Sequence, residues 1–243
     1  MNILETKKLE KDYGGVRAVH NLSIEIPEGR ITGLIGPNGS GKTTLINLLS
    51  GFSSPTHGTV TISGSERKTI LPWENPIYGL TRTFQQIRLF EQMSVLDNLL
   101  VTLTERSPFA SIFERHGKLH LIRAGEILKK VGLEEKKNIF AENLSYGQRK
   151  LLEIARIMAM NASIILLDEP FAGLFPEMVN QIAALIKEMR REGKTIVLVE
   201  HNMAIIRELC DHLVVMDAGE LLAEGKPEEI LSRPEVLEAY LGE

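Results

Sequence analysis

The sequence has a single cysteine, no long apolar run and no excess of positive charge. Cys210 alone cannot form an internal disulfide, which fits a reducing compartment. A membrane-spanning helix needs about 18 consecutive apolar residues, and no stretch of the sequence approaches that length. The N-terminus also lacks the apolar core of a secretory signal. The formal net charge of −4 gives no basic footprint for nucleic acid. These absences predict a cytosolic protein that needs a membrane-crossing partner for any task at a membrane.

The apolar residues that are present follow two patterns. Apolar and polar residues alternate at Leu22–Ile26 and at Val60–Ile62, which is typical of antiparallel strands with one wet face. Ile164–Leu167 and Ile196–Val199 are instead continuously apolar, which is typical of parallel strands covered on both faces by helices. With 243 residues and 43% hydrophobic content, the chain can bury a large core. The expected fold class is therefore α/β.

Between about Met93 and Glu142 the sequence becomes helical and polar. We interpret this stretch as an inserted helical lobe, so that one domain, 1–243, has a core of about 1–92 and 143–243 and an insert of about 93–142. The breakers expected inside the insert are Pro108, Gly117, Gly125 and Gly132. In the tail, Pro227 and Pro234 are each expected to open a helix.

The strongest local signal is a phosphate-binding loop. GPNGSGKT matches GxxxxGK[ST], follows the apolar stretch Ile31–Ile35 and precedes a helix-compatible stretch, which is the context that this motif requires. Glycines let successive backbone N–H groups surround phosphates, and the helix N-terminus adds positive potential. Lys42 is expected to reach the β- and γ-phosphates, and the Thr43 hydroxyl to hold Mg²⁺. The expected nucleotide-binding residues are Gly36, Pro37, Asn38, Gly39, Ser40, Gly41, Lys42, Thr43 and Thr44.

Two carboxylates follow the apolar strand Ile164–Leu167. Asp168, at the end of the strand, is placed to bind Mg²⁺, and Glu169 to orient or deprotonate an attacking water. Taken alone, an apolar strand followed by Asp-Glu is also an ordinary loop start. Behind a phosphate-binding loop, the catalytic interpretation is favoured.

A helix start lies shortly before this strand, in the sequence LSYGQ. The Ser145-x-x-Gln148 spacing predicts a capping box for a helix with an apolar stripe. As plain structure this is a well-capped helix. LSYGQ also resembles the LSGGQ signature of ABC ATPases, with Tyr146 in place of the first glycine. The resemblance implies that Ser145, Gly147 and Gln148 bind ATP held by an opposite subunit, so that two chains enclose two ATP molecules.

The same resemblance assigns roles to three more residues. Tyr13 matches the aromatic that stacks on adenine, although a strand aromatic is the plain alternative. Gln85 matches the glutamine that senses Mg²⁺ and the γ-phosphate, and His201 matches the switch histidine that contacts the γ-phosphate, although a lone histidine is usually structural. The implied fold is a P-loop NTPase of ABC ATPase type, with a mixed central sheet, an antiparallel β subdomain and an inserted helical lobe. The implied cofactors are ATP and Mg²⁺.

Several segments are similar to the ATPases of branched-chain amino-acid importers. They are Tyr78–Phe90, Met93–Leu99, the LSYGQRKLLEIAR stretch and Pro234–Glu243. This similarity implies a peripheral protein at the cytoplasmic face of the membrane, with a second ATPase subunit, permease subunits and, indirectly, a substrate-binding protein as partners. The residues expected in the cleft for the permease, unless they serve ordinary helix packing, are Ile87, Leu89, Phe90 and Met93. The alternatives are an ABC motor for urea, amides or lipid, and a soluble ABC ATPase without a transport role.

Phe175 departs from the family pattern. The loop after the Asp168-Glu169 pair normally carries Asp or Asn at this position, where it helps to link the two ATP sites of a dimer. Phenylalanine cannot make those hydrogen bonds, so either the backbone provides the coupling or the two sites communicate differently. One hypothesis is that the chain pairs with a different, more standard ATPase subunit.

Overall fold

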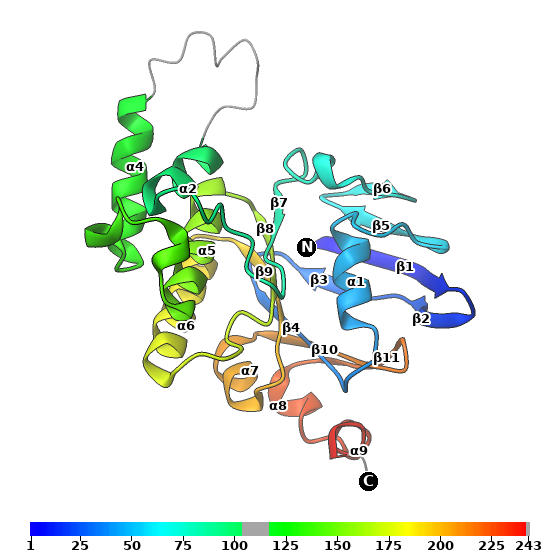
Figure 1. Ribbon diagram of the computed structural model, residues 1–243. Coiled ribbons are helices and arrows are strands. Elements are labelled where there is room, and N and C mark those ends of the chain that lie inside the picture. The colour runs from blue at the N-terminus through cyan, green and yellow to red at the C-terminus, as the bar shows by residue number, and fades with distance from the viewer. Residues whose placement is uncertain (104–116, 242–243) are drawn as a thin grey trace. The chain divides into compact units, whose positions relative to one another are not determined.

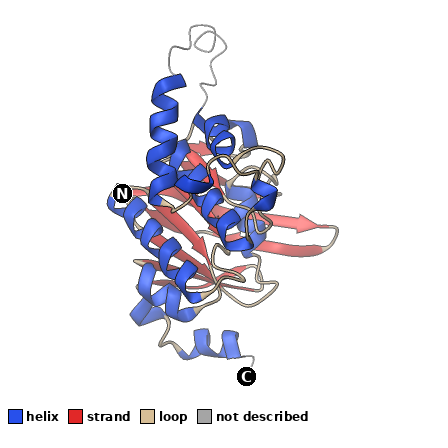
Figure 2. Cartoon of the chain, turned by 60° about the vertical axis from the view of Figure 1, so that its left-hand side comes forward, coloured by secondary structure: helices blue, strands red, loops and turns tan. Residues whose placement is uncertain are grey.

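The computed structural model describes residues 1–103 and 117–241, which form two compact units (Figure 1). The first unit contains Met1–Arg82, Ala162–Pro170 and Lys187–Glu243, and the second contains Thr83–Asn161 and Phe171–Ile186. Every strand of the described residues belongs to the first unit, and the described regular elements of the second are helices (Figure 2). The predicted breaker Pro108 lies outside the described residues.

The first unit contains an antiparallel sheet in the order β2-β1-β5-β6, with β3 paired to β1. Its strands are β1 (Asn2–Tyr13), β2 (Val16–Leu22), β3 (Glu25–Pro27), β5 (His57–Ile62) and β6 (Ser65–Arg67). The alternation at Leu22–Ile26 belongs to two strands, because β2 pairs with the second half of β1 and β3 with the first half. The Thr6 hydroxyl spans this break by donating to the Leu22 carbonyl and accepting from the Ile24 amide. The expected alternation is confirmed at Val60 and Ile62, which are both buried.

The second sheet of this unit carries the parallel strands. Its order is β11-β10-β4-β9-β8-β7, and all neighbours are parallel except β10 and β11. The strands are β4 (Ile31–Ile35), β7 (Leu80–Arg82), β8 (Ile164–Asp168), β9 (Thr195–Val199), β10 (His212–Asp217) and β11 (Glu220–Gly225). Every residue of β4, β8 and β9 is buried, as their continuous apolar sequences predict. Since parallel strands end at one edge, the loops after these three strands meet there.

Among the described residues, four α-helices lie wholly within the first unit: α1 (Lys42–Leu49), α7 (Met203–Leu209), α8 (Pro227–Ile230) and α9 (Pro234–Leu241). Helix α1 begins directly after the glycine-rich loop and contacts β2 and β8, burying Leu45, Ile46 and Leu49 in the core. Pro227 and Pro234 open the last two helices, as predicted. The core of the unit thus fixes both ends of the glycine-rich loop.

The second unit is built on α2 (Val95–Leu103), α4 (Gly117–Lys130), α5 (Tyr146–Met160) and the residues of α6 (Pro176–Arg191) up to Ile186. Helix α2 packs against α4 and α5. The unit is larger than the insert predicted at 93–142, because α5 follows that insert in sequence but packs with it.

One of the predicted breakers is wrong. Gly125 lies inside α4, where the position of a Cβ atom meets open space, so a glycine there costs some helix propensity without ending the helix. Gly117 is the first residue of α4, which does not contradict a break at that position. Gly132, with φ +69°, does lie just beyond the end of α4. None of the helices in the described ranges combines the length and the apolar character that crossing a membrane requires.

Candidate nucleotide site

The loop between β4 and α1 needs its glycines. Gly36, Gly39 and Gly41 have φ values of +154°, +82° and +97°, which favour glycine. A Cβ atom on Gly36 would lie 2.1 Å from the Met216 carbonyl oxygen, and one on Gly41 would lie 2.3 Å from the Ala18 carbonyl oxygen. The loop therefore passes close to its neighbours through bare backbone, as a backbone cradle for phosphate requires.

Lys42 lies folded over this loop. It is buried, and its Nζ donates to the carbonyl oxygens of Gly36 at 2.8 Å and Pro37 at 2.9 Å. Burial lowers the pKa of Lys42, while the nearby carboxylates of Glu169 and Asp168 oppose that effect. Thr43 is exposed in the first turn of α1. An ammonium and a helix N-terminus together form an anion site.

Asp168 ends β8 and is paired with an arginine that the sequence analysis left without a role. Both side chains are buried, and Arg82 Nη2 lies 3.6 Å from Asp168 Oδ2. Arg82 Nη1 also donates to Asn47 Oδ1 and Ser50 Oγ, each at 2.8 Å. Arg82 ends β7, the neighbour of β8, so only knowledge of the strand order reveals the pair.

Replacing Arg82 with methionine should lower the free energy of unfolding by about 3–5 kcal/mol, because Asp168 would remain buried without its cation. Urea denaturation measures the loss, and adding Asp168→Asn to the same chain should recover part of it. The matched control is Lys187→Gln, which removes an exposed ion pair with Glu208 and should change little. A loss below about 1 kcal/mol for Arg82→Met would contradict the role given to the buried pair.

Glu169 and His201 are brought together at the ends of β8 and β9. His201 Nε2 lies 2.9 Å from Glu169 Oε1, and both side chains are partly exposed. Glu169 has φ +49°, and its N–H donates to the Val199 carbonyl. A non-glycine residue in this left-handed region is strained, and such residues concentrate at functional sites. The carboxylate is thus held at the same sheet edge as the glycine-rich loop.

Tyr13 lies at the end of β1 with about half of its surface exposed, at 48%. Its hydroxyl shares a 3.0 Å hydrogen bond with Ser53 Oγ, and Lys11 Nζ lies 4.8 Å from the ring centre. The next strand, β2, contributes the Ala18 carbonyl that borders Gly41. An exposed ring on this hairpin is free to stack on a base, and stacking on adenine stays a prediction.

The predicted capping box is present at the start of α5, in the second unit. Ser145 Oγ accepts from the Gln148 N–H at 3.4 Å, and Gln148 Oε1 accepts from the Ser145 N–H at 3.1 Å. The Gln148 side chain is therefore engaged in capping. The turn borders a hollow of about 320 Å³. Its lining residues are Ser145, Tyr146, Gly147, Gly173, Leu174, Phe175, Glu177 and Met178.

Gln85 also belongs to the second unit, where it is exposed. Of the residues predicted for the docking cleft, Phe90 and Met93 line a hollow of about 420 Å³ together with Glu91, Gln92 and Glu142. Ile87 and Leu89 are half-buried and are not among the lining residues.

Soft-metal and thiol chemistry find no support in the described part of the chain. It contains no group of three or more His, Cys, Asp or Glu side chains that could hold a metal ion. Burial, followed by the charges of Asp211 and Glu200, raises the pKa of Cys210 to about 12, so this thiol stays protonated at neutral pH. The hydroxyl of Thr43 and the carboxylate of Asp168 are hard oxygen donors, which suit Mg²⁺.

The family model described as "ABC transporter" matches residues 19–172, a span that includes the glycine-rich loop, LSYGQ and the Asp168-Glu169 pair. The chain belongs to the ABC transporter family. A second model, described as "Branched-chain amino acid ATP-binding cassette transporter", matches residues 220–243 of this ABC ATPase.

Relatives of the ABC ATPase are similar over nearly the whole chain. The high-affinity branched-chain amino acid transport ATP-binding protein LivG of Salmonella typhimurium is 41% identical, covering 99% of this chain and 98% of LivG. The corresponding protein BraF of Pseudomonas aeruginosa is 39% identical, with the same coverage.

Two solved structures extend the comparison. The ADP conformation of the ATP-binding cassette MJ1267 has a TM-score of 0.87 at 36% identity and covers all of both chains. The post-hydrolysis dimer of the cassette MJ0796, bound to ADP and Pi, has a TM-score of 0.79 at 30% identity, covering 92% of this chain and 98% of that one. The predicted fold and ATPase activity are thereby confirmed: the protein binds nucleotide and hydrolyses ATP as an ABC ATPase.

Proposed function

We propose that this ABC ATPase powers an importer of branched-chain or related amino acids. The observation that carries the proposal is the full-length similarity to LivG and BraF, together with the match of residues 220–243 to the branched-chain model. Closure of an ATPase dimer on ATP and its reopening after hydrolysis would drive the membrane subunits. The protein would then lie peripherally at the cytoplasmic face of the membrane.

In the proposed site, the loop Gly36–Thr44 binds the phosphates and Tyr13 stacks on adenine. Thr43 and Asp168 would hold Mg²⁺ and Gln85 would sense it, and the ion would neutralise charge on the transferring phosphoryl group. The grouping of Lys42 with Asp168 and Glu169 at one sheet edge supports these roles. Glu169 acts as the general base toward water, and His201, hydrogen-bonded to it, contacts the γ-phosphate.

Ser145 and Gly147 are proposed to face the nucleotide of a partner ATPase subunit, using the N-terminus of α5 as an anion site. The dimeric state described for MJ0796 supports this arrangement. The further partners are permease subunits, which contact the 90–93 segment, and a substrate-binding protein on the far side of the membrane.

Phe175 favours a partner ATPase of different sequence. Its side chain is 80% exposed beside the hollow that Ser145 and Gly147 line, and it offers no hydrogen bond to a second subunit. Co-expression with neighbouring genes followed by purification in ATP should yield a complex that contains a second ATPase chain. Exclusive self-dimerisation with full cooperativity would contradict this pairing.

Reconstitution of the purified complex in liposomes tests the substrate. We expect ATP-dependent uptake of leucine, isoleucine or valine in the presence of the binding protein, and no uptake when the ATPase carries Glu169→Gln. ATP hydrolysis that responds only to a binding protein loaded with urea, an amide or lipid would contradict the amino-acid assignment.

A further inference from the structure

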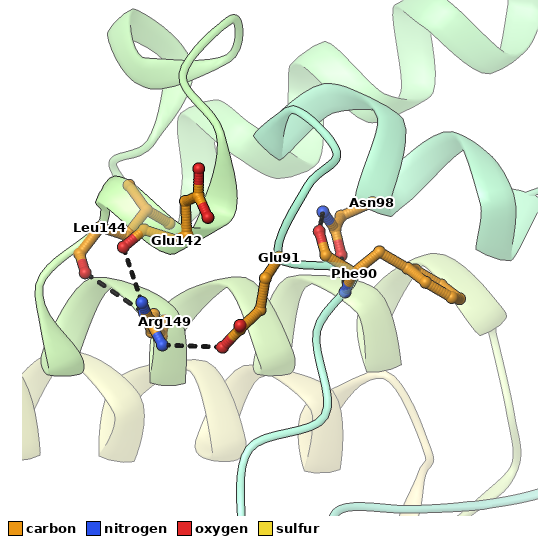
Figure 3. Close-up of polar contacts among 6 residues, drawn as sticks. All are labelled: Phe90, Glu91, Asn98, Glu142, Leu144 and Arg149. Atoms are coloured by element: carbon orange, nitrogen blue, oxygen red, sulfur yellow. Dashed lines mark hydrogen bonds and ion pairs between the residues drawn. The ribbon is translucent and has the colours of Figure 1, made fainter.

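Arg149, in the first turn of α5, uses its guanidinium on three different partners (Figure 3). Nε donates to the Leu144 carbonyl at 3.3 Å and Nη2 to the Glu142 carbonyl at 2.6 Å. Nη1 donates to Glu91 Oε1 at 3.1 Å, across 58 residues of sequence. One side chain thus joins the stretch that enters the helix to a distant segment of the same unit.

The bond to Leu144 acts on Ser145 through a single peptide group. The Leu144 carbonyl and the Ser145 N–H belong to the same planar unit. Arg149 holds its oxygen, while Gln148 Oε1 accepts from its N–H at 3.1 Å. Both polar ends of this peptide are therefore fixed, which sets the direction in which Ser145 presents its hydroxyl.

Glu91, at the other end of the link, lies in a segment that is itself firmly anchored. The fully buried Asn98 amide accepts from the Phe90 N–H and donates to the Phe90 carbonyl, each at 3.0 Å (Figure 3). It also donates to the Ser94 carbonyl at 3.0 Å. The Glu91 carbonyl also accepts from the Glu142 N–H at 3.1 Å. These hydrogen bonds fix the backbone around Glu91, so a displacement of the 90–93 segment also displaces Glu91.

Helix α5 holds the residues before Glu91 as well. Arg156 donates to the Arg88 carbonyl, and its guanidinium lies 5.1 Å from the centre of the Phe90 ring. Glu153 accepts a hydrogen bond from the Phe84 N–H. Three residues of α5, namely Arg149, Glu153 and Arg156, thus attach segment 84–91 to the helix. Of these three, Arg149 is the nearest to Ser145 in the sequence.

The exposed ion pair between Arg149 and Glu91 would not by itself indicate a functional role. The Glu91 side chain is 61% exposed, and such pairs add little to stability. The two carbonyl bonds of Arg149 are different, because they use a charged donor to hold the backbone of Glu142 and Leu144, directly before Ser145. Their loss should therefore disturb the orientation of Ser145 more than the stability of the unit.

We propose that Arg149 is a positioning residue for Ser145, and that its ion pair with Glu91 couples the 90–93 segment to the turn that Ser145 begins. This rests on the proposed function, in which Ser145 faces the nucleotide of a partner subunit and the permease contacts the 90–93 segment. Contact with the permease would then reach the neighbouring ATP site through one guanidinium.

Arg149→Gln tests the positioning role in the complete complex. We expect kcat for ATP hydrolysis to fall about tenfold or more, since charge-assisted hydrogen bonds are lost. The isolated chain should keep its affinity for a fluorescent ATP analogue, because its own phosphate loop lies in the first unit, and should keep its melting temperature. Arg149→Lys should recover only part of kcat, since an ammonium cannot reproduce the planar fork.

The matched control is Lys187→Gln, which removes the ion pair with Glu208. Its partners are similarly exposed, at 37% and 58% against 29% and 61%, and neither has a proposed role. Lys187→Gln should leave every readout unchanged. Wild-type kcat in Arg149→Gln would overturn the proposal. So would a parallel fall in nucleotide affinity and melting temperature, which indicates a merely structural role.

A double-mutant cycle with Glu91→Gln tests the coupling. If the pair acts as a unit, Glu91→Gln lowers kcat in the wild-type background but adds no further loss to Arg149→Gln. Losses that multiply, or no loss from Glu91→Gln, would overturn the coupling. Gly147→Asp separates this from the proposed function: it should abolish hydrolysis, because it adds a negative charge to the proposed anion site and a Cβ atom that would lie 3.0 Å from Met178 Cε. If Gly147→Asp hydrolyses ATP normally, the proposed role of the turn itself fails.

Discussion

Glu169→Gln is expected to lower the rate of ATP hydrolysis about a thousandfold while leaving ATP binding nearly intact. The glutamine keeps the size of the side chain but cannot take a proton from water. The structure supports this role through the hydrogen bond between Glu169 Oε1 and His201 Nε2 and through the strained φ of +49°. Steady-state phosphate release and equilibrium ATP binding, measured on the same preparation, separate the two effects.

Glu224→Gln is the matched control. Glu224 accepts the same kind of hydrogen bond, from His212 Nε2 at 3.0 Å, and its side chain is 25% exposed, against 24% for Glu169. It lies on β11, and Glu224→Gln should hydrolyse ATP at the wild-type rate. Hydrolysis near that rate in Glu169→Gln would exclude Glu169 as the general base.

Residues in one continuous stretch could be predicted from the sequence because local chemistry determines them. The strand Ile31–Ile35, the glycine-rich turn and helix α1 follow one another in the sequence, so the motif and the strand–loop–helix context that it requires are both visible in one stretch. The cap of α5 is equally local, since Ser145 and Gln148 are three residues apart. The roles proposed for Gln85 and His201 come from the resemblance alone, because no local rule predicts them.

Contacts that depend on the order of strands or helices could not be predicted. Arg82 meets Asp168 only because β7 pairs with β8, which nothing near Arg82 in the sequence indicates. Arg149 meets Glu91 only because the start of α5 lies against the 90–93 segment. Even the error at Gly125 has this origin, since the packing of α2 and α4 holds the helix through a residue that disfavours it.

Lys42→Met should weaken ATP binding by roughly a hundredfold, because the phosphates lose a charged donor in a buried loop. Methionine keeps the unbranched side chain, so the comparison isolates the charge. In the free protein the ammonium lies at hydrogen-bond distance from the carbonyls of Gly36 and Pro37 and from the Ser40 hydroxyl, and burial lowers the pKa of Lys42. Below its folded pKa the charged form is therefore disfavoured by folding, so removing it should not reduce the free energy of unfolding.

The Lys42→Met variant separates the effect of the lysine on ATP affinity from its effect on the free energy of unfolding. Equilibrium binding of ATP and urea denaturation of the nucleotide-free chain should respond in different ways: affinity falls, and stability is unchanged or slightly higher. Lys42→Arg retains charge, but its planar guanidinium does not fit a turn where Nζ lies 2.8 Å from the Gly36 carbonyl, so it should also bind ATP poorly. Native affinity in Lys42→Met would exclude Lys42 as the phosphate ligand. Equal losses of affinity and stability would instead mean that the lysine shapes the loop, and that its charge matters to folding before any nucleotide arrives.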